Sequence, residues 1–123
     1  AGMAKMKILL VDDEQEFSLT LAERLEIRGY EVKTAVNGED ALQFLEKSLP
    51  QIVVLDLKMP GLSGIEVLKR IKALYPDLPV LLLTGYGSTQ EGIKGMQLGA
   101  YDYLLKPLDI DTLISKLKEA ISA

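Results

Sequence analysis

The sequence predicts an α/β fold in which helices cover both faces of a doubly wound, five-stranded parallel sheet. Five short apolar segments alternate with five segments whose apolar residues follow helical spacing, and the links between them are short. Right-handed crossovers limit the possible topologies. We expect the strand order 2-1-3-4-5, which places the first and third strands side by side where the order reverses.

Length and composition indicate one globular domain over residues 5–123, and we interpret Ala1-Gly2-Met3-Ala4 as a cloning remnant. Of the 123 residues, 48% are apolar and 26% are charged, which is ordinary for a globular protein. No apolar run is long enough to span a membrane and no signal peptide is visible. We therefore expect a cytoplasmic protein with no membrane partner.

Two residue types are absent from the sequence, and their absence excludes several kinds of site. Without cysteine there are no disulfides or thiolate metal sites, and without histidine there is no imidazole zinc site or histidine acid–base catalysis. The formal net charge is −4, the pI is about 4.8, and no Lys- or Arg-rich block occurs. Direct nucleic-acid binding by this domain is therefore not expected.

The first predicted strand is Lys7–Val11, and it is followed by a helix from about Gln15 to Arg28. This helix carries an apolar stripe at helical spacing: Phe17, Leu21, Ala22 and Leu25. Gly29 supplies its C-terminal stop. The next strand, Glu31–Ala35, alternates polar and apolar residues and is short, which indicates an edge position.

Asn37 is placed to cap the second helix, whose core positions are Ala41, Leu42 and Leu45. The third strand, Ile52–Asp56, is a continuous apolar run that ends on a carboxylate, so it should be buried on both faces. Ser63 and Glu66 then form an S-x-x-E capping box that opens the third helix.

The fourth strand is Val80–Thr84, and a second S-x-x-E, at Ser88 to Glu91, opens a short helix over 89–98. Gly92 and Gly95 lie inside this helix, and each costs roughly 1 kcal/mol relative to alanine. Either the helix is a movable element or the glycines allow close packing on a neighbour. The final pair is a strand over 101–105 and a helix over 110–122.

Four of the predicted strands deliver polar residues at their C-terminal ends: Asp12, Asp13, Asp56, Thr84 and Lys106. In a parallel sheet these ends share one edge, so three carboxylates, a hydroxyl and an ammonium should meet there. The alternatives that need no functional site are that the acids cap a helix or start a turn and that the lysine is a surface charge. Crowded carboxylates need a proton or a cation, and an all-oxygen set suits Mg²⁺.

Such a cluster is suited to phosphoryl transfer. A carboxylate beside a metal ion and an ammonium can attack phosphorus as a nucleophile. The metal ion and the lysine then offset charge on the phosphoryl oxygens, to which a hydroxyl can donate a hydrogen bond.

The sequence resembles the receiver domain of two-component response regulators over nearly the whole chain, which also implies a flavodoxin-like (βα)5 fold. The matching motifs are Val11-Asp12-Asp13-Glu14, Leu55-Asp56-Leu57-Lys58-Met59-Pro60-Gly61, Leu83-Thr84-Gly85 and Lys106-Pro107. Each is weak alone, but together and in this order they are highly specific. Two further stretches resemble receivers attached to AAA+ transcriptional activators: residues 84–88 and 98–103.

The resemblance implies a role for each matching residue. Asp56 is the phosphorylated residue, and Thr84 and Lys106 contact the phosphoryl group. Asp13, Asp56 and the backbone carbonyl of Lys58 ligate Mg²⁺, while Asp12 assists, often through water.

The resemblance also implies a switch and partners. Tyr103 matches a switch aromatic, although an ordinary half-exposed strand tyrosine is the alternative, and the Lys106-Pro107 bond is expected to be cis. Because the chain has no histidine, its phosphoryl donor in a phosphorelay must be a sensor histidine kinase, a histidine phosphotransfer protein or a small phospho-donor. The output is a changed surface on the fourth helix, fifth strand and fifth helix, used for a homodimer or for another partner.

Three other functions compete with this interpretation. A flavin or dinucleotide site could use Gly85-Tyr86-Gly87-Ser88-Thr89-Gln90, but the third glycine of G-x-G-x-x-G is missing and the acids would repel a pyrophosphate. A phosphoaspartate hydrolase has D-x-D after a strand, whereas Asp56 is followed at that spacing by Lys58. A docking module without phosphorylation would not need the complete set of polar residues.

Overall fold

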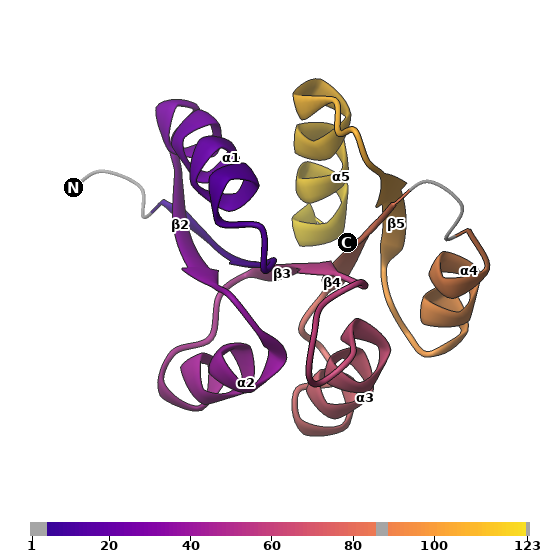
Figure 1. Cartoon of the computed structure of the whole chain (residues 1–123). Helices are drawn as coiled ribbons and strands as arrows, with labels where there is room; N and C mark the ends of the chain where they lie inside the picture. The colour runs from indigo at the N-terminus through magenta and orange to yellow at the C-terminus, as the bar shows by residue number, and fades with distance from the viewer. Residues whose placement is uncertain (1–4, 86–88, 123) are drawn as a thin grey trace.

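The computed structural model describes residues 5–85 and 89–122, which form five strands and five helices in strict alternation (Figure 1). The expected cloning remnant and the Ser88 cap lie outside these residues. The elements follow in this order: β1 Met6–Val11, α1 Gln15–Ile27, β2 Tyr30–Ala35, α2 Gly38–Lys47, β3 Ile52–Asp56, α3 Gly64–Leu74, β4 Val80–Thr84, α4 Thr89–Gln97, β5 Asp102–Leu105 and α5 Ile110–Ser122.

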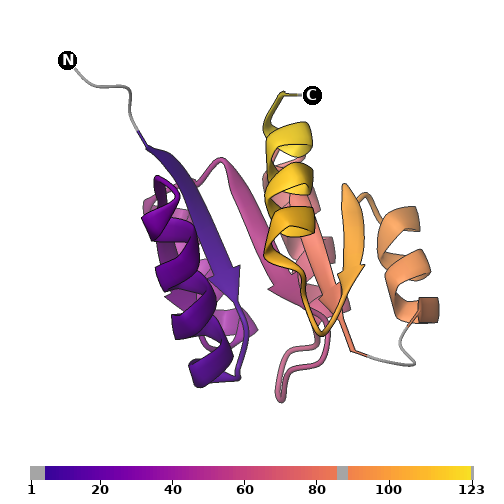
Figure 2. The same ribbon diagram turned by 90° about the horizontal axis from the view of Figure 1, so that it is seen from above.

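All five strands are parallel and lie in the order β2-β1-β3-β4-β5, as predicted. β1 therefore pairs with β2 on one side and β3 on the other, and the strand order reverses between β1 and β3. Figure 2 shows the arrowheads at one edge of the sheet, with the start of β1 and the end of α5 toward the other. The C-terminal strand ends thus form a single edge.

Two apolar layers flank the sheet because alternate residues of each central strand face opposite sides. In β3, Val53 and Leu55 pack toward α2 and α3, whereas Ile52 and Val54 pack toward α1 and α5. The side chains of β3 and β4, and those of β1 from Ile8 to Val11, are almost fully buried between these layers. This rigid centre fixes the residues that follow each strand.

Element boundaries differ from the predictions by one residue at several ends. β2 begins at Tyr30, because Tyr30 pairs with Met6 and is buried, although it directly follows the glycine assigned to the turn. α1 ends at Ile27 and α4 at Gln97, and each is followed within two residues by a glycine of positive φ, Gly29 and Gly99.

The predicted helix caps are confirmed where the structure describes them. The Asn37 side chain accepts a hydrogen bond from the Asp40 N–H at 2.8 Å, and the Ser63 hydroxyl accepts one from the Glu66 N–H at 3.2 Å. Each cap satisfies an N–H that the first turn leaves free. Both helices therefore begin where the sequence indicates.

The glycines of α4 allow this helix to lie very close to the sheet. A Cβ at residue 92 would come within 2.8 Å of the Tyr103 ring, and one at residue 95 would come within 2.2 Å of the Leu82 side chain. Both glycines are buried. Close packing therefore explains the two glycines, which was one of the two alternatives.

β2 is an edge strand, as predicted, and β5 forms the other edge. β5 is only half-buried, in contrast to the fully buried β3 and β4. Within the described part of the chain, no helix is long and apolar enough to cross a membrane.

Candidate functional site

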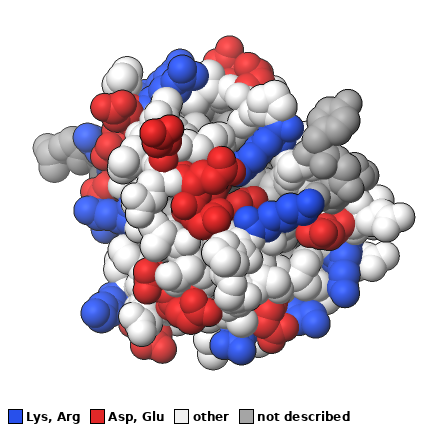
Figure 3. Space-filling view, in the orientation of Figure 1, with Lys and Arg blue, Asp and Glu red and all other residues white. Residues whose placement is uncertain are grey.

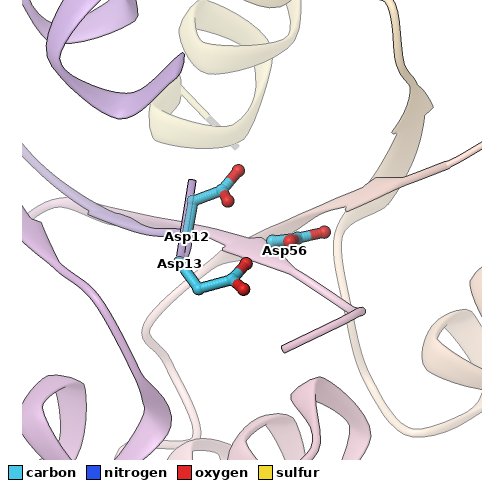
Figure 4. A group of neighbouring side chains, drawn as sticks. All are labelled: Asp12, Asp13 and Asp56. Carbon is cyan, nitrogen blue, oxygen red and sulfur yellow. The ribbon is translucent and has the colours of Figure 1, made fainter. Parts of the chain in front are cut away.

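Three carboxylates meet at the C-terminal ends of β1 and β3. One oxygen each of Asp12, Asp13 and Asp56 lies within 4.8 Å of the others. Figure 4 shows the three side chains directed toward the same side of the sheet edge. Asp12 and Asp56 are buried and Asp13 is exposed, so the cluster opens to solvent on one side. Predicted neighbours from separate strands are thus brought together.

Asp12 organises the turn between β1 and α1. Its N–H donates to the Ala35 carbonyl at 3.0 Å, and its carboxylate accepts from the Glu14 N–H at 2.9 Å. Glu14 is the N-cap residue of α1, and its side chain makes no capping hydrogen bond. Asp12 therefore stabilises the start of α1 by accepting a hydrogen bond from the residue before its first turn. Its second carboxylate oxygen, Oδ2, faces the site.

The loop after β3 is held close to the start of α3. The Asp56 carboxylate accepts from the Lys58 N–H at 3.3 Å, and the Lys58 side chain is exposed. A Cβ at residue 64 would lie 2.5 Å from the Leu57 Cα and 2.7 Å from the Asp56 carbonyl oxygen. Only glycine fits there without a shift, so this contact fixes the backbone beside Asp56.

Lys106 follows β5 and reaches across the sheet edge into the carboxylate cluster. Its ammonium lies 2.8 Å from Asp12 Oδ2, 3.2 Å from Glu14 Oε1 and 3.8 Å from Asp56 Oδ2. Its side chain is only 17% exposed, which argues against a free surface charge. The Lys106-Pro107 peptide bond is cis, as expected.

Thr84 ends β4, the strand that neighbours β3, and its backbone carbonyl accepts from the Lys106 N–H at 2.8 Å. Its side chain is fully buried, and its hydroxyl has no hydrogen-bond partner among residues 5–85 and 89–122. A buried polar group without a partner costs free energy, on the order of 1–3 kcal/mol. Within the described ranges, the hydroxyl is therefore available to donate a hydrogen bond to an added acceptor.

The two charged groups at the centre have shifted pKa values. The pKa of Asp56 is raised from 3.8 to about 6, chiefly by burial and then by the charge of Asp12, against the opposing effects of Lys106 and the Lys58 N–H. Burial alone would lower the pKa of Lys106, but its hydrogen bond to Asp12 and the nearby charges raise it above 10.5. Lys106 therefore keeps its positive charge, whereas the surroundings of Asp56 disfavour its negative charge.

Tyr103 lies apart from the carboxylate cluster. It is a half-buried residue of β5 whose ring packs against α4 at Gly92. It also borders the apolar layer between the sheet and helices α2 and α3. Its ring is thus packed on one side and partly open on the other.

Two contacts of Lys106 were not predicted from the sequence. Glu14 follows the acid pair directly, and this adjacency was the only signal for its ion pair. Phe17 lies under the ammonium, with its ring centroid 4.4 Å from Nζ. The sequence signal for Phe17 was an apolar helical position, which is shared by every core residue of α1.

The oxygen atoms at this edge suit a hard cation. The three aspartates bring carboxylates, and the chain contains no histidine or cysteine that would favour a softer ion. Figure 3 shows acidic side chains gathered near the centre of the face that Figure 1 presents, with basic side chains beside them. The site therefore combines excess negative charge with a local positive group.

Comparison with known proteins gives a consistent picture. The family model described as response regulator receiver domain matches residues 8–118. PrrA, a transcriptional regulatory protein of Mycobacterium tuberculosis, is 35% identical over 117 residues, which is 95% of this chain and 50% of that protein. ZraR, a transcriptional regulatory protein of Salmonella typhimurium, is 38% identical over 118 residues, which is 96% of this chain and 27% of that protein.

A solved receiver domain from Clostridium thermocellum is 36% identical with a TM-score of 0.91, and the match covers 95% of this chain and 94% of that one. The chain spans at most about half the length of these two curated relatives. The residues that the family model matches include the positions at the acidic edge of the sheet. The chain therefore belongs to the family of response regulator receiver domains, the phosphoacceptor modules of two-component signalling.

Proposed function

We propose that Asp56 accepts the phosphoryl group, within a single receiver domain of residues 5–123. The observation that carries the proposal is the environment of its carboxylate. Asp56 is buried at a strand end, 3.8 Å from a lysine ammonium and beside a strand that ends in Thr84, whose hydroxyl has no hydrogen-bond partner among the residues that the structure describes. A nucleophile, a fixed cation and a free donor are the parts that phosphoryl transfer needs.

In the proposed reaction a carboxylate oxygen of Asp56 forms a bond to phosphorus. The bond between phosphorus and the donor's histidine nitrogen breaks, and the electron pair leaves with the imidazole. The product is an acyl phosphate on Asp56. Lys106 offsets charge on a phosphoryl oxygen, and the Thr84 hydroxyl donates a hydrogen bond to another.

The proposal includes Mg²⁺ at the carboxylate cluster, held by Asp13, Asp56 and the Lys58 carbonyl, with Asp12 assisting through water. When bound, the ion supplies charge neutralisation at the transferring group. Hydrolysis of the acyl phosphate at the same residues returns the free carboxylate. The domain thus catalyses only its own phosphorylation and dephosphorylation.

The phosphoryl donor in this proposal is a sensor histidine kinase, a histidine phosphotransfer protein or a small phospho-donor. The chain supplies no histidine of its own. We also propose that the domain acts in the cytoplasm, where it meets such donors. Since two curated relatives are transcriptional regulators in which this domain is a fraction of the length, an output domain belongs to the same proposal.

Phosphorylation is proposed to act through Thr84 and Tyr103 on the surface formed by α4, β5 and α5. An acceptor on Asp56 draws the Thr84 hydroxyl toward it, and the shift changes the space open to the Tyr103 ring. Large apolar side chains are exposed on this surface, with Ile93 48%, Met96 39% and Leu105 47% exposed. They suit a homodimer or a partner that binds the two states differently.

Intact-mass analysis after treatment with acetyl phosphate and Mg²⁺ tests the assignment. We expect one phosphoryl group on the wild type and none on Asp56→Asn. Equal modification of both proteins would reject Asp56 as the acceptor.

A further inference from the structure

The ammonium of Lys106 rests on the face of an aromatic ring. Its Nζ lies 4.4 Å from the centroid of Phe17. A lysine above a ring face is attracted by the negative π cloud, and the attraction grows as water is excluded. With the lysine side chain only 17% exposed, water is largely excluded here.

The ring of Phe17 is packed against neighbouring side chains and is not freely exposed to solvent. Phe17 lies in the first turns of α1, is half-buried, and packs against the apolar layer that includes Leu21 and Leu25. It also borders a cavity of about 320 Å³ with Leu108 and Ile110, from the segment after Lys106. The ring therefore connects α1 to the chain that carries the ammonium.

The hydrogen bonds of Lys106 explain why an aromatic ring face suits the remaining side of its ammonium. An ammonium has three N–H donors, and Asp12 and Glu14 accept from it at 2.8 Å and 3.2 Å. Asp56 stands further away, at 3.8 Å. Another carboxylate in place of the ring would hold the ammonium too, but it would add repulsion and compete with a phosphoryl oxygen. A ring face attracts the cation and adds no net charge.

We propose that Phe17 is a positioning residue, which keeps the Lys106 ammonium beside Asp56 through its ring face. This inference rests on the proposed phosphoacceptor function and adds a residue outside the polar cluster to it. Phe17 acts through Lys106 and has no contact of its own with the phosphoryl group in the proposal.

The test compares Phe17→Leu, which removes the ring, with Phe17→Tyr, which keeps it. The initial rate of phosphorylation by acetyl phosphate at saturating Mg²⁺ should fall roughly three- to tenfold in Phe17→Leu and stay within about twofold of wild type in Phe17→Tyr. Phe44→Leu is the matched control, because Phe44 is the only other phenylalanine and borders the opposite apolar layer. Its rate should not change.

A Lys106→Met background separates positioning from a general structural effect. If Phe17 acts through the ammonium, Phe17→Leu should cause no further loss of rate once Lys106 is replaced. The same fold loss in both backgrounds would overturn the inference, as would an unchanged rate in Phe17→Leu alone. If the wild type itself is not phosphorylated on Asp56, the proposed function fails instead.

NMR of the wild type without Mg²⁺ gives a readout that needs neither activity nor a destabilising variant. The ring current of Phe17 should shift the Lys106 ε-methylene protons upfield of those of exposed lysines such as Lys33. Phe17→Tyr should keep this shift. Ordinary lysine resonances for Lys106 in the wild type would show that the ammonium does not rest on the ring, and would overturn the inference.

Discussion

The ring of Tyr103 lies against the backbone of α4 at Gly92, so closely that a Cβ there would come within 2.8 Å of two ring carbons. Because residue 92 is a glycine, no side chain of its own separates the ring from the helix backbone at this point. The position of the ring and the residue at 92 are therefore linked by direct contact.

Gly92→Ala should displace the Tyr103 ring. The added methyl raises helix propensity by about 1 kcal/mol, but it collides with the ring and so removes packing. We expect a small net change in the free energy of unfolding and large shifts of the Tyr103 ring resonances. In a Tyr103→Ala background the collision is gone, and Gly92→Ala should then stabilise by about 1 kcal/mol. Unchanged ring resonances would contradict the packing described here.

Asp56→Asn should stabilise the Mg²⁺-free domain at neutral pH. The pKa of Asp56 is about 6 in the folded protein, above its ordinary value of 3.8, so the charged form is disfavoured by folding. At about 1.4 kcal/mol per pKa unit, the replacement should raise the free energy of unfolding at pH 7.5 by on the order of 1–3 kcal/mol.

The advantage of Asp56→Asn should depend on pH in a defined direction. Because the folded pKa is the higher one, the penalty is fully present above pH 6, shrinks as the pH falls from 6 toward 3.8, and is absent below. Urea unfolding in EDTA at pH 7.5 and pH 4 measures it, with the exposed Asp77→Asn as control. An advantage that grows on acidification would contradict the shift.

Asp13→Ala should weaken binding of Mg²⁺ by about tenfold or more, since it removes one anionic ligand from the cluster. The fold should survive, because Asp13 is exposed and its loss reduces repulsion. Titration of Mg²⁺ measures the affinity, and Asp77→Ala, just before β4 at the opposite edge of the sheet, is the control. Equal affinities of Asp13→Ala and wild type would exclude Asp13 as a ligand.

Thr84→Val should stabilise the unphosphorylated domain by about 1 kcal/mol, because it removes a buried hydroxyl that lacks a partner within the described chain. Beryllofluoride, a phosphoryl mimic, should bind this variant more weakly, because the donor is lost. Thr34→Val on β2 is the exposed control. Destabilisation of Thr84→Val would mean that the hydroxyl already has a partner.

Beryllofluoride with Mg²⁺ should change hydrogen exchange in α4 and β5. The added acceptor engages Thr84, at the end of the strand that contacts both of these elements. Asp56→Asn should show no such change. Changes confined to α1 and α2 would show that the switch lies in another part of the domain.

Much of the fold could be predicted because the central strands are continuous apolar runs between helical segments. Such runs are buried whichever way they face, so their strand ends were predicted closely. Tyr30 was missed because a residue after glycine is ambiguous, and only pairing with Met6 makes it part of β2. The glycines of α4 left two explanations open, since sequence does not show which ring packs on them.

The site was predicted as a set of residues and not as a set of contacts. Parallel strands bring their ends to one edge, so Asp12, Asp56 and Lys106 were expected together. Which carboxylate holds the ammonium depends on side-chain geometry across the sheet, and it is Asp12 that lies nearest, at 2.8 Å. Phe17 could not be distinguished from the other core residues of α1, because all of them are apolar residues at the same helical spacing.

The ion pair of Lys106 with Asp12 joins residues 94 positions apart, and this separation orders events during synthesis of the chain. A ribosome synthesises all three aspartates before the lysine that offsets their charge. Until β5 docks at the far edge of the sheet, the nascent domain carries the repulsion of the acids without their counter-charge. With the role proposed for Lys106, competence to receive a phosphoryl group therefore arrives only with the last strand.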